Sequence, residues 1–446
     1  MKTIASAVAG LALSFSASLG FATNPADLRG DIADDYEYLY NLYTHLHQNP
    51  ELSFQERETM ERLKAEMLGL GFDVTDNVGG YGLVCVMENG AGPTLMIRAD
   101  TDALPVEEQT GLPYASTKKM TEQTVDGSGT EVSVMHACGH DVHMTVWVGT
   151  ARRLVDLKDH WSGTLVMIAQ PAEERGAGAK AMLEEGLFTR WPRPDYNLAL
   201  HVSARIPAGT VGFVPEWAMA NVDSVDITVH GIGGHGSTPH VTKDPVVIAA
   251  QIVTALQTIV AREVNPQRPA VVTVGSIHGG AKHNIISERC DLQLTVRSYD
   301  DETRNLLLSS IERIAVNMGR VAGLPEDRLP EVYVKDEFTP SLYNDPNLTE
   351  RVKRIAETAL GADRVRPEVP VMGGEDFGRY GREEPRIPSL LYWLGAPDPA
   401  FFENSQRRGV IIPGPHTPYF APNPELTLPT GVEVMTAAAL DLLSQR

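Results

Sequence analysis

The sequence contains little cysteine and too few basic residues to balance its acidic ones. Only 3 of its 446 residues are cysteine, an odd number that cannot form a fully paired disulfide framework. At least one of Cys85, Cys138 and Cys290 therefore has another use. With 38 basic against 58 acidic residues the net charge is −20, which repels phosphate backbones and anionic lipid headgroups. We therefore do not expect nucleic acid as a partner.

Long apolar runs are also missing, except at the N-terminus. Lys2 precedes an uncharged run of apolar and small residues over 3–23, which is the pattern of a secretory signal peptide. We expect residues 1–23 to be removed and the exported chain to begin near Asn24, in the periplasm or secreted. A membrane anchor or a buried N-terminal helix is the alternative. No later stretch looks long and apolar enough to span a bilayer, so we expect no membrane association after cleavage.

The remaining composition is that of a soluble protein with two domains. Hydrophobic residues make up 42% and charged residues 22%, close to the globular average, and the length exceeds one ordinary core. Helices are expected over 36–48 and 56–70, and apolar runs at 82–87, 94–99, 164–169 and 197–202 predict strands. Continuous apolar runs suit strands covered on both faces of an α/β sheet, where ligands bind outside the carboxyl ends of the strands.

Residues 218–335 follow a different pattern. They predict strand (223–230), helix (244–262), strand (270–278), strand (288–298), helix (301–322) and strand (331–335), the order of a ferredoxin-like split βαβ domain. Helices are expected again over 347–360 and 429–443. We therefore expect one large domain, residues 24–217 and 336–446, interrupted by this insertion.

The densest group of chemically active residues lies at 135–143, which holds three histidines, one cysteine and one aspartate. Cys138 and His140 can both face one metal ion if the backbone turns at Gly139, whose missing Cβ permits unusual dihedrals. A single histidine here would usually be structural, but the whole cluster indicates a metal. Cys138 as a ligand would also explain the odd thiol.

Other candidate ligands follow the predicted strands. Glu173 and Glu174 come after the run 164–169, so one carboxylate could bind a cation while the other accepts a proton. A solvated acidic turn is the alternative. His201 follows the run 197–200, and His416 lies in a proline-rich loop. Five ligands are too many for one tetrahedral zinc, but they suit two cations that share a ligand. The five candidates are Cys138, His140, Glu174, His201 and His416.

Two further positions have weaker signals. Asp102 follows the run 94–99 and could orient a metal-bound imidazole, although an aspartate-rich turn is equally reasonable. The loop 231–237 is too rich in glycine for a packed element, and it lacks the Lys-Ser/Thr ending of a phosphate loop. His235 in this loop could instead stabilise the oxyanion of a tetrahedral intermediate.

Nine motifs in this order resemble a known family: HQNPELSFQE, RADTDALP, MHACGHDVH, QPAEE, LALHV, GGHGSTPH, AKHNIISE, MGGEDFG and PHTP. The chain resembles the aminoacylase-like metal-dependent amidohydrolases, the branch of the zinc exopeptidase superfamily that includes hippurate hydrolases and indole-acetyl amino acid hydrolases. The resemblance extends over essentially the whole mature chain. It implies a zinc-exopeptidase-like catalytic domain with a mixed central sheet flanked by helices, and a ferredoxin-like lid that forms a homodimer.

The resemblance also implies roles for individual residues. Glu173 would be the general base, and two divalent ions would bind Cys138, His140, Glu174, His201 and His416. His235 and Asn284 would contribute to the substrate site, across the dimer, and Arg297 would pair with the substrate carboxylate. The signal peptide and the segment PHTPYFAPNPE around His416 depart from the usual pattern of the family.

The expected activity is hydrolysis of the amide bond of small N-acyl amino acids by a metal-activated water. Carboxylic acid and amino acid would be the products. A metallo-exopeptidase, either a dipeptidase or a carboxypeptidase acting on short peptides, would use the same centre. A periplasmic binding protein without turnover is a third alternative. The thiolate favours zinc, while the other ligands also admit manganese, cobalt or nickel.

Overall fold

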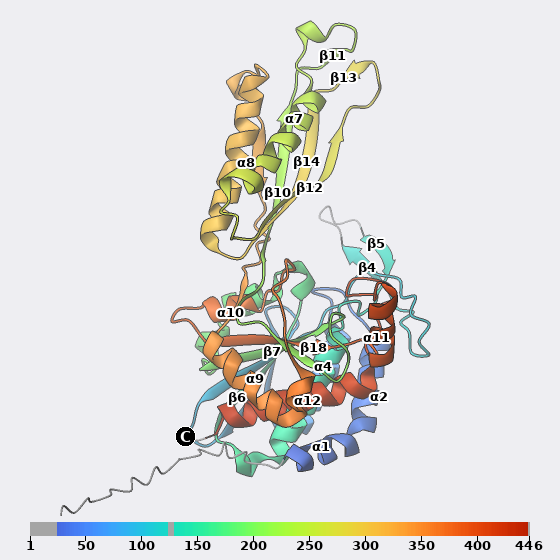
Figure 1. The fold of residues 1–446 in the computed structure, drawn as a ribbon, viewed down its shortest axis with the longest axis vertical. Coiled ribbons are helices and arrows are strands. Elements are labelled where there is room, and N and C mark those ends of the chain that lie inside the picture. Colours follow the sequence, from blue (N-terminus) through green and yellow to red (C-terminus); the bar gives the residue numbers. More distant parts are fainter. Residues whose placement is uncertain (1–24, 124–128, 445–446) are drawn as a thin grey trace, which may run out of the picture.

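A computed structural model describes residues 25–123 and 129–444. The expected signal peptide, residues 1–23, lies outside the described residues. Figure 1 shows a large domain of mixed sheet and helices with a narrower, elongated domain standing on it.

The large domain contains an eight-stranded mixed sheet. Its strands lie in the order β1-β2-β6-β3-β7-β18-β8-β17. The four central strands, β6, β3, β7 and β18, run parallel, so their carboxyl ends meet at one edge of the sheet. The strands are β1 (Asp73–Val78), β2 (Gly82–Asn89), β3 (Thr94–Asp100), β6 (Gly163–Gln170), β7 (Tyr196–Ser203), β8 (Val211–Phe213), β17 (Val365–Pro367) and β18 (Ser389–Gly395).

Both faces of this sheet are covered, as the continuous apolar runs predicted. In β3, Leu95 and Ile97 belong to the core on one face and Met96 to the core on the other. Successive side chains of a strand point to opposite faces, so every position of such a strand can be apolar. Each fully buried aliphatic side chain contributes about 1.5–3 kcal/mol. The predicted α/β class with a mixed central sheet is confirmed.

Helices form the two outer layers. Residues of α1 (Pro25–Asp34), α2 (Tyr36–Gln48), α3 (Arg57–Gly69), α4 (His140–Asp156), α9 (Pro346–Leu360) and α12 (Pro424–Leu442) belong to the larger core. Residues of α5 (Gly178–Glu184), α6 (Leu187–Arg190) and α10 (Gly378–Arg382) belong to the core on the opposite face. A further helix, α11 (Pro399–Arg408), precedes the loop that carries His416.

The expected start of the last helix at residue 429 was wrong. Asn423 caps α12, because its side chain accepts a hydrogen bond from Leu426 N at 3.1 Å. Pro424 then occupies the first turn, where a missing N–H costs nothing. Pro429 lies inside the helix, so the proline that suggested a start is an interior residue.

The elongated domain, called the lid below, has its own sheet and core. Strands β10 (Asn221–His230), β12 (Ala270–Gly279), β14 (Arg289–Ser298) and β15 (Glu331–Val334) pair antiparallel in the order β12-β14-β10-β15. Helices α7 (Pro245–Thr258) and α8 (Asp301–Val321) pack on this sheet around a separate apolar core. This is the predicted split βαβ arrangement.

Three short two-stranded ribbons complete the fold. β11 (Gly234–His235) pairs with β13 (Ile285–Ile286) at the end of the lid farthest from the large domain (Figure 1). β9 (Glu216–Met219) pairs with β16 (Leu342–Asn344), next to the segments that connect the two domains. β4 (Lys119–Gln123) pairs with β5 (Gly129–Ser133) on the large domain.

One later segment does have the length and composition of a membrane span, contrary to the sequence analysis. Within the described residues it is the single helical stretch Pro245–Glu263, with a mean hydropathy of 1.5. Its inner face, including Ile248, Ile252 and Leu256, is buried against the lid sheet. About a third of the 18 most apolar consecutive residues in this stretch are buried. The stretch is therefore part of a folded domain, with one apolar face buried and further apolar residues, including Val246, Val247 and Val260, exposed on the other side.

Candidate metal centre

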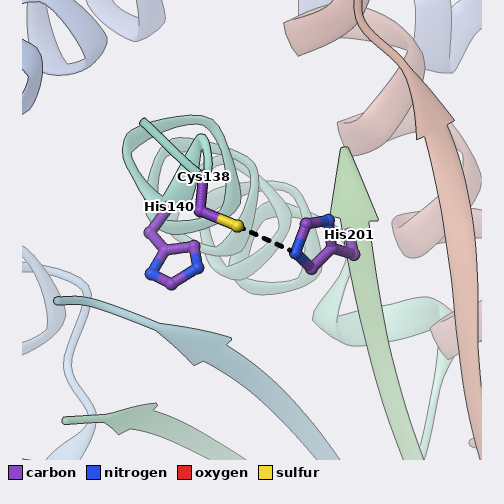
Figure 2. A group of neighbouring side chains, drawn as sticks. All are labelled: Cys138, His140 and His201. Carbon is purple, nitrogen blue, oxygen red and sulfur yellow. Dashed lines mark hydrogen bonds between the residues drawn. The ribbon is translucent and has the colours of Figure 1, made fainter. Parts of the chain in front are cut away.

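The candidate centre lies where α4 begins, at the carboxyl edge of the central strands. Cys138 and His140 flank Gly139, which caps α4 with φ of 81°. A Cβ on Gly139 would lie 2.5 Å from Val202 Cγ2, so both the dihedral and the space require glycine. Figure 2 shows Cys138 pointing across to His201 of β7, with Cys138 Sγ 3.4 Å from His201 Nε2.

The backbone fixes the orientation of both imidazoles. His140 Nδ1 donates to the main-chain oxygen of Asp102 at 2.8 Å, and His201 Nδ1 donates to the main-chain oxygen of Val202 at 2.7 Å. A ring nitrogen that faces a carbonyl oxygen must carry the proton. Nε2 of each ring therefore presents a lone pair, as metal-bound histidines do.

The loop after β6 brings Glu173 and Glu174 to the same place. The carboxylate of Asp102 accepts a hydrogen bond from Glu173 N and another from Glu174 N, each at 3.1 Å. Glu174 then lies with one oxygen 4.0 Å from His140 Nε2 and the other 3.4 Å from His416 Nε2. Asp102 thus contacts His140 Nδ1 through its main-chain oxygen and, at 3.4 Å, through its carboxylate, as expected from the sequence, and the same carboxylate also holds the two glutamates.

His416 is held by an unusual backbone conformation. Its φ is 65°, a region that non-glycine residues rarely adopt, and its N–H donates to Ala137 O at 2.8 Å. The loop is thereby tied to the residue before Cys138. This contact brings His416 to the centre, although it lies more than 270 positions after Cys138 in the sequence.

The side chains present fit two divalent cations. Potential ligand atoms lie within 4.8 Å of one another in the sets Cys138–His140–His201, Cys138–Glu174–His416 and His140–Glu173–Glu174. The first two sets share Cys138, as a two-metal centre with a common ligand requires. His140 Nε2 and Glu174 Oε1 are buried and, among the described residues, have no hydrogen-bond partner. Thiol, imidazole and carboxylate donors suit zinc and related metals.

The electrostatics of the centre point the same way. Burial raises the pKa of Glu174 to about 8 and, with repulsion from Glu174 and Glu173, raises the pKa of the Cys138 thiol well above its usual value. Burial lowers the pKa of His201, which keeps its imidazole neutral. Buried acidic groups without enough cations bind protons in this way. Divalent ions would supply the missing positive charge and keep these ligands deprotonated.

Glu173 is suited to proton transfer. Its side chain is buried, and burial together with the carboxylates of Glu375 and Glu174 raises its pKa well above the usual range. A carboxylate that binds a proton more tightly than an exposed one is a better general base near neutral pH. Both glutamates lie near His140, but only Glu174 also lies with Cys138 and His416, and only Glu173 lies with Glu375 and Asp376.

A cavity of about 960 Å³ opens over the centre between the large domain and the lid. Cys138, Glu173, His201 and His416 line it from the large domain, and Arg297 of β14 lines it from the lid. Arg297 Nη1 donates to Met372 O at 2.6 Å, and no carboxylate pairs with it among the described residues. Burial lowers the pKa of its guanidinium, so an anion placed beside it would be favoured.

A family comparison agrees with this geometry. The model of Peptidase family M20/M25/M40 matches residues 96–441. The chain belongs to this family. Among the relatives of this M20 protein, thermostable carboxypeptidase 2 of Saccharolobus solfataricus is 34% identical over 86% of this chain and 91% of its own length. N-acetyl-L-cysteine deacetylase of Bacillus subtilis is 36% identical over 77% of each chain.

A solved structure supports the number of metals in this M20 chain. A Bacillus subtilis protein described as a dinuclear metal binding peptidase of the M20 family superposes with a TM-score of 0.73. It is 27% identical, and the match covers 92% of this chain and 99% of that one. The M20 protein described here is a metal-dependent amidohydrolase, and its centre suits two divalent metals.

Several buried residues of the M20 centre had no role in the sequence analysis. Arg98 donates to Asp100 at 2.6 Å, to Glu375 at 2.9 Å and to Asp376 at 3.2 Å. His143 Nδ1 lies 2.5 Å from Asp100 Oδ1. The signal was present in the motifs RADTDALP and MGGEDFG, whose charged residues have little reason to be buried unless they form a network.

Two of the expected substrate-site residues lie elsewhere in the M20 chain. His235 and Asn284 are exposed at the far end of the lid (Figure 1), where Gly236 N donates to Asn284 O at 2.9 Å. His235 Nδ1 there accepts a hydrogen bond from Ser237 N. The lid strands carry this tip away from the large domain, so neither residue lines the cavity of its own chain.

Proposed function

We propose that this M20 chain hydrolyses the amide bond of N-acyl amino acids and releases a carboxylic acid and an amino acid. The pair Glu173 and Glu174 carries this proposal. Their N–H groups share the carboxylate of Asp102, yet only Glu174 lies in the set with Cys138 and His416, whereas only Glu173 also lies beside the buried carboxylates of Glu375 and Asp376. The relative named N-acetyl-L-cysteine deacetylase supports the substrate class, because that name describes removal of an acyl group from an amino acid.

The chain's own residues divide the work of hydrolysis. Cys138, His140, Glu174, His201 and His416 would hold two divalent ions, which when bound polarise the acyl carbonyl and activate water. Glu173 takes one proton from the attacking water and delivers it to the departing nitrogen. The oxygen of that water becomes part of the new carboxylate as the C–N bond breaks. Arg297 in the cavity wall pairs with the carboxylate of the amino-acid half.

A metallo-exopeptidase is the second candidate, because a relative 34% identical to this chain is named a carboxypeptidase. A peptide has the same amide bond and the same terminal carboxylate as an acylated amino acid, so the centre and Arg297 suit both. The two differ in the group on the acyl side. A free amino group there would identify a peptidase.

One screen separates these possibilities. The protein without residues 1–23 would be stripped of metal, and zinc, manganese, cobalt and nickel would be returned singly. Each form would be tested on N-acetyl and N-benzoyl amino acids and on dipeptides, with products detected by mass spectrometry. We expect faster release from the N-acyl amino acids. Faster cleavage of dipeptides would favour the peptidase, and binding without product would indicate a binding protein without turnover.

The lid is proposed to form a homodimer. β12 is an edge strand of its sheet, and edge strands readily pair with another chain. Val246, Val247 and Val260 on the outer face of the helical stretch 245–263 are 38%, 52% and 38% exposed, so a second lid would cover an apolar surface. His235 and Asn284 at the lid tip would then contribute to the partner's substrate site, where His235 could stabilise the oxyanion.

Sedimentation at micromolar concentration tests the dimer. We expect Val247→Lys to shift the protein toward monomer and to lower turnover, because each monomer would lack the second lid. Val321→Lys is the matched control, since Val321 is 76% exposed at the end of α8. A monomeric wild-type protein with full activity would exclude both the dimer and the shared site.

We also propose that the protein is exported, to the periplasm or beyond it. The charged Lys2 and the uncharged run 3–23 support this. Expression of the full chain followed by fractionation and N-terminal sequencing is the test. A cytoplasmic protein that retains residues 1–23 would contradict it.

A further inference from the structure

The turn between α2 and α3, residues 51–56, lies against the loop that carries Glu173 and Glu174. Glu51 O accepts a hydrogen bond from Ala103 N at 2.7 Å, and Ser53 Oγ donates to Asp102 Oδ2 at 2.6 Å. This turn is the second half of the motif HQNPELSFQE. Nothing in the proposed reaction uses any of its residues.

Two buried carboxyl groups collect three consecutive N–H groups of the glutamate loop. Glu56 Oε1 accepts from Ala172 N at 2.8 Å. Asp102 accepts from the next two residues, Glu173 and Glu174, at 3.1 Å each. Both acceptor side chains are fully buried, so water does not compete for these hydrogen bonds. Glu56 therefore accepts the hydrogen bond of the first N–H group of the loop, and Asp102 accepts those of the other two.

Ala172 needs such support because its backbone is strained. Its φ is 52° and its ψ is 41°, the left-handed region that residues with a Cβ avoid. The loop also packs closely on the start of α5, since a Cβ on Gly178 would lie 1.6 Å from Pro171 O. The left-handed residue directly precedes Glu173, so its conformation sets the direction in which both glutamates leave β6.

We propose that Glu56 is a positioning residue that holds Ala172 in the left-handed conformation and thereby sets Glu173 and Glu174 at the metal centre. Its catalytic consequence rests on the proposed function. Its consequence for metal binding does not, because Glu174 belongs to the ligand set whatever the substrate is.

A space-filling role does not explain Glu56. Its Oε2 atom is buried and has no hydrogen-bond partner among the described residues, an arrangement that costs free energy. An apolar side chain would fill the space without that cost. Burial and repulsion from Asp102 also raise the pKa of Glu56 to about 8, so a neutral acceptor of the same shape should replace it well.

The test compares two substitutions of similar size. Glu56→Met keeps the volume and lacks an acceptor, whereas Glu56→Gln keeps the acceptor. In Glu56→Met we expect metal affinity to fall about 10- to 100-fold and kcat of the metal-saturated enzyme to fall about 100-fold with KM nearly unchanged. Glu56→Gln should keep both the metal affinity and kcat near their wild-type values. Glu61→Met, at an exposed position of α3, is the control and should change neither.

A second substitution tests the strain directly. Glycine reaches the left-handed region without the steric penalty, so adding Ala172→Gly to Glu56→Met should recover about tenfold of the lost metal affinity. Wild-type affinity in Glu56→Met, equal losses in the Met and Gln variants, or no recovery on adding glycine would each overturn the proposal. If the wild type hydrolyses no amide, the proposed function fails, and metal affinity alone still decides the role of Glu56.

Discussion

His143 Nε2 accepts a hydrogen bond from the main-chain N–H of Val202, the residue after the candidate ligand His201, at 2.9 Å. Its other ring nitrogen, Nδ1, lies 2.5 Å from Asp100 Oδ1. Both nitrogens are therefore engaged by the protein, and burial lowers the pKa of His143 to about 4, which keeps the ring neutral. We therefore expect His143 to support the candidate ligands instead of binding metal, although its ring lies close enough to Asp100 and His140 to form a further candidate set.

This arrangement predicts different losses for two histidines three positions apart. His143→Ala should weaken metal binding about 10- to 100-fold while leaving both sites fillable at high metal. His140→Ala should leave at least one site empty at any practical concentration. Metal content by elemental analysis, measured across a titration of added metal, distinguishes the two variants. Equal behaviour would show that His143 is itself a ligand.

Cys138→Ala should remove a ligand that two sets share. We expect the variant to lose metal and turnover together, because neither set is complete without the thiolate. Cys85→Ala is the control, since Cys85 is a buried residue of β2 in the apolar core and should affect stability but not metal content. Full occupancy in Cys138→Ala would remove this residue from the centre.

Glu173→Gln and Glu174→Gln should separate proton transfer from metal binding. The first variant should keep metal and lose about 10²- to 10⁴-fold in kcat, the usual contribution of a general base. The second should lose metal. Single-turnover rates on metal-saturated protein, with occupancy measured in parallel, are the readout. A metal-loaded Glu173→Gln enzyme with nearly normal kcat would mean that another group takes the proton.

The buried His47 predicts a pH dependence of stability. Burial disfavours its charged form, but hydrogen bonds to Asp141 and Glu108 outweigh this and raise its pKa to about 9. Because the folded pKa exceeds the unfolded value of about 6.5, the stabilisation is complete below pH 6.5 and is lost as the pH rises through 9. The shift corresponds to about 3 kcal/mol.

Urea unfolding at pH 6 and at pH 10, with metal saturating, measures this effect. The wild type should lose about 3 kcal/mol more of its free energy of unfolding between these pH values than His47→Gln does. His45→Gln, at an exposed position of the same helix, should retain the wild-type slope. Equal slopes in all three proteins would mean that His47 is not the titrating group.

The sequence was sufficient for features that depend on neighbouring residues. Apolar runs located the central strands within a residue or two, because a strand buried on both faces needs no polar position. The spacing of apolar residues and the order of the expected strands and helices predicted the split βαβ lid. Glu173, Glu174 and His201 could be selected as candidates because each follows or ends a predicted strand, and parallel strands deliver their carboxyl ends to one edge.

Only the tertiary structure decided which distant groups meet. The carboxylate of Asp102 lies beside the His140 imidazole, as expected, but it also binds the N–H groups of Glu173 and Glu174, a second role set by loop geometry and not by local sequence. Glu56 and Ala172 are 116 positions apart, and the left-handed φ of Ala172 has no signature in an Ala-Glu-Glu sequence. The motif of His235 predicted a substrate-site residue, and the length of the lid strands carries it to the far tip, outside the cavity of its own chain. Spacing along a chain specifies periodicity, whereas contact across a cavity depends on how rigid elements are placed against each other.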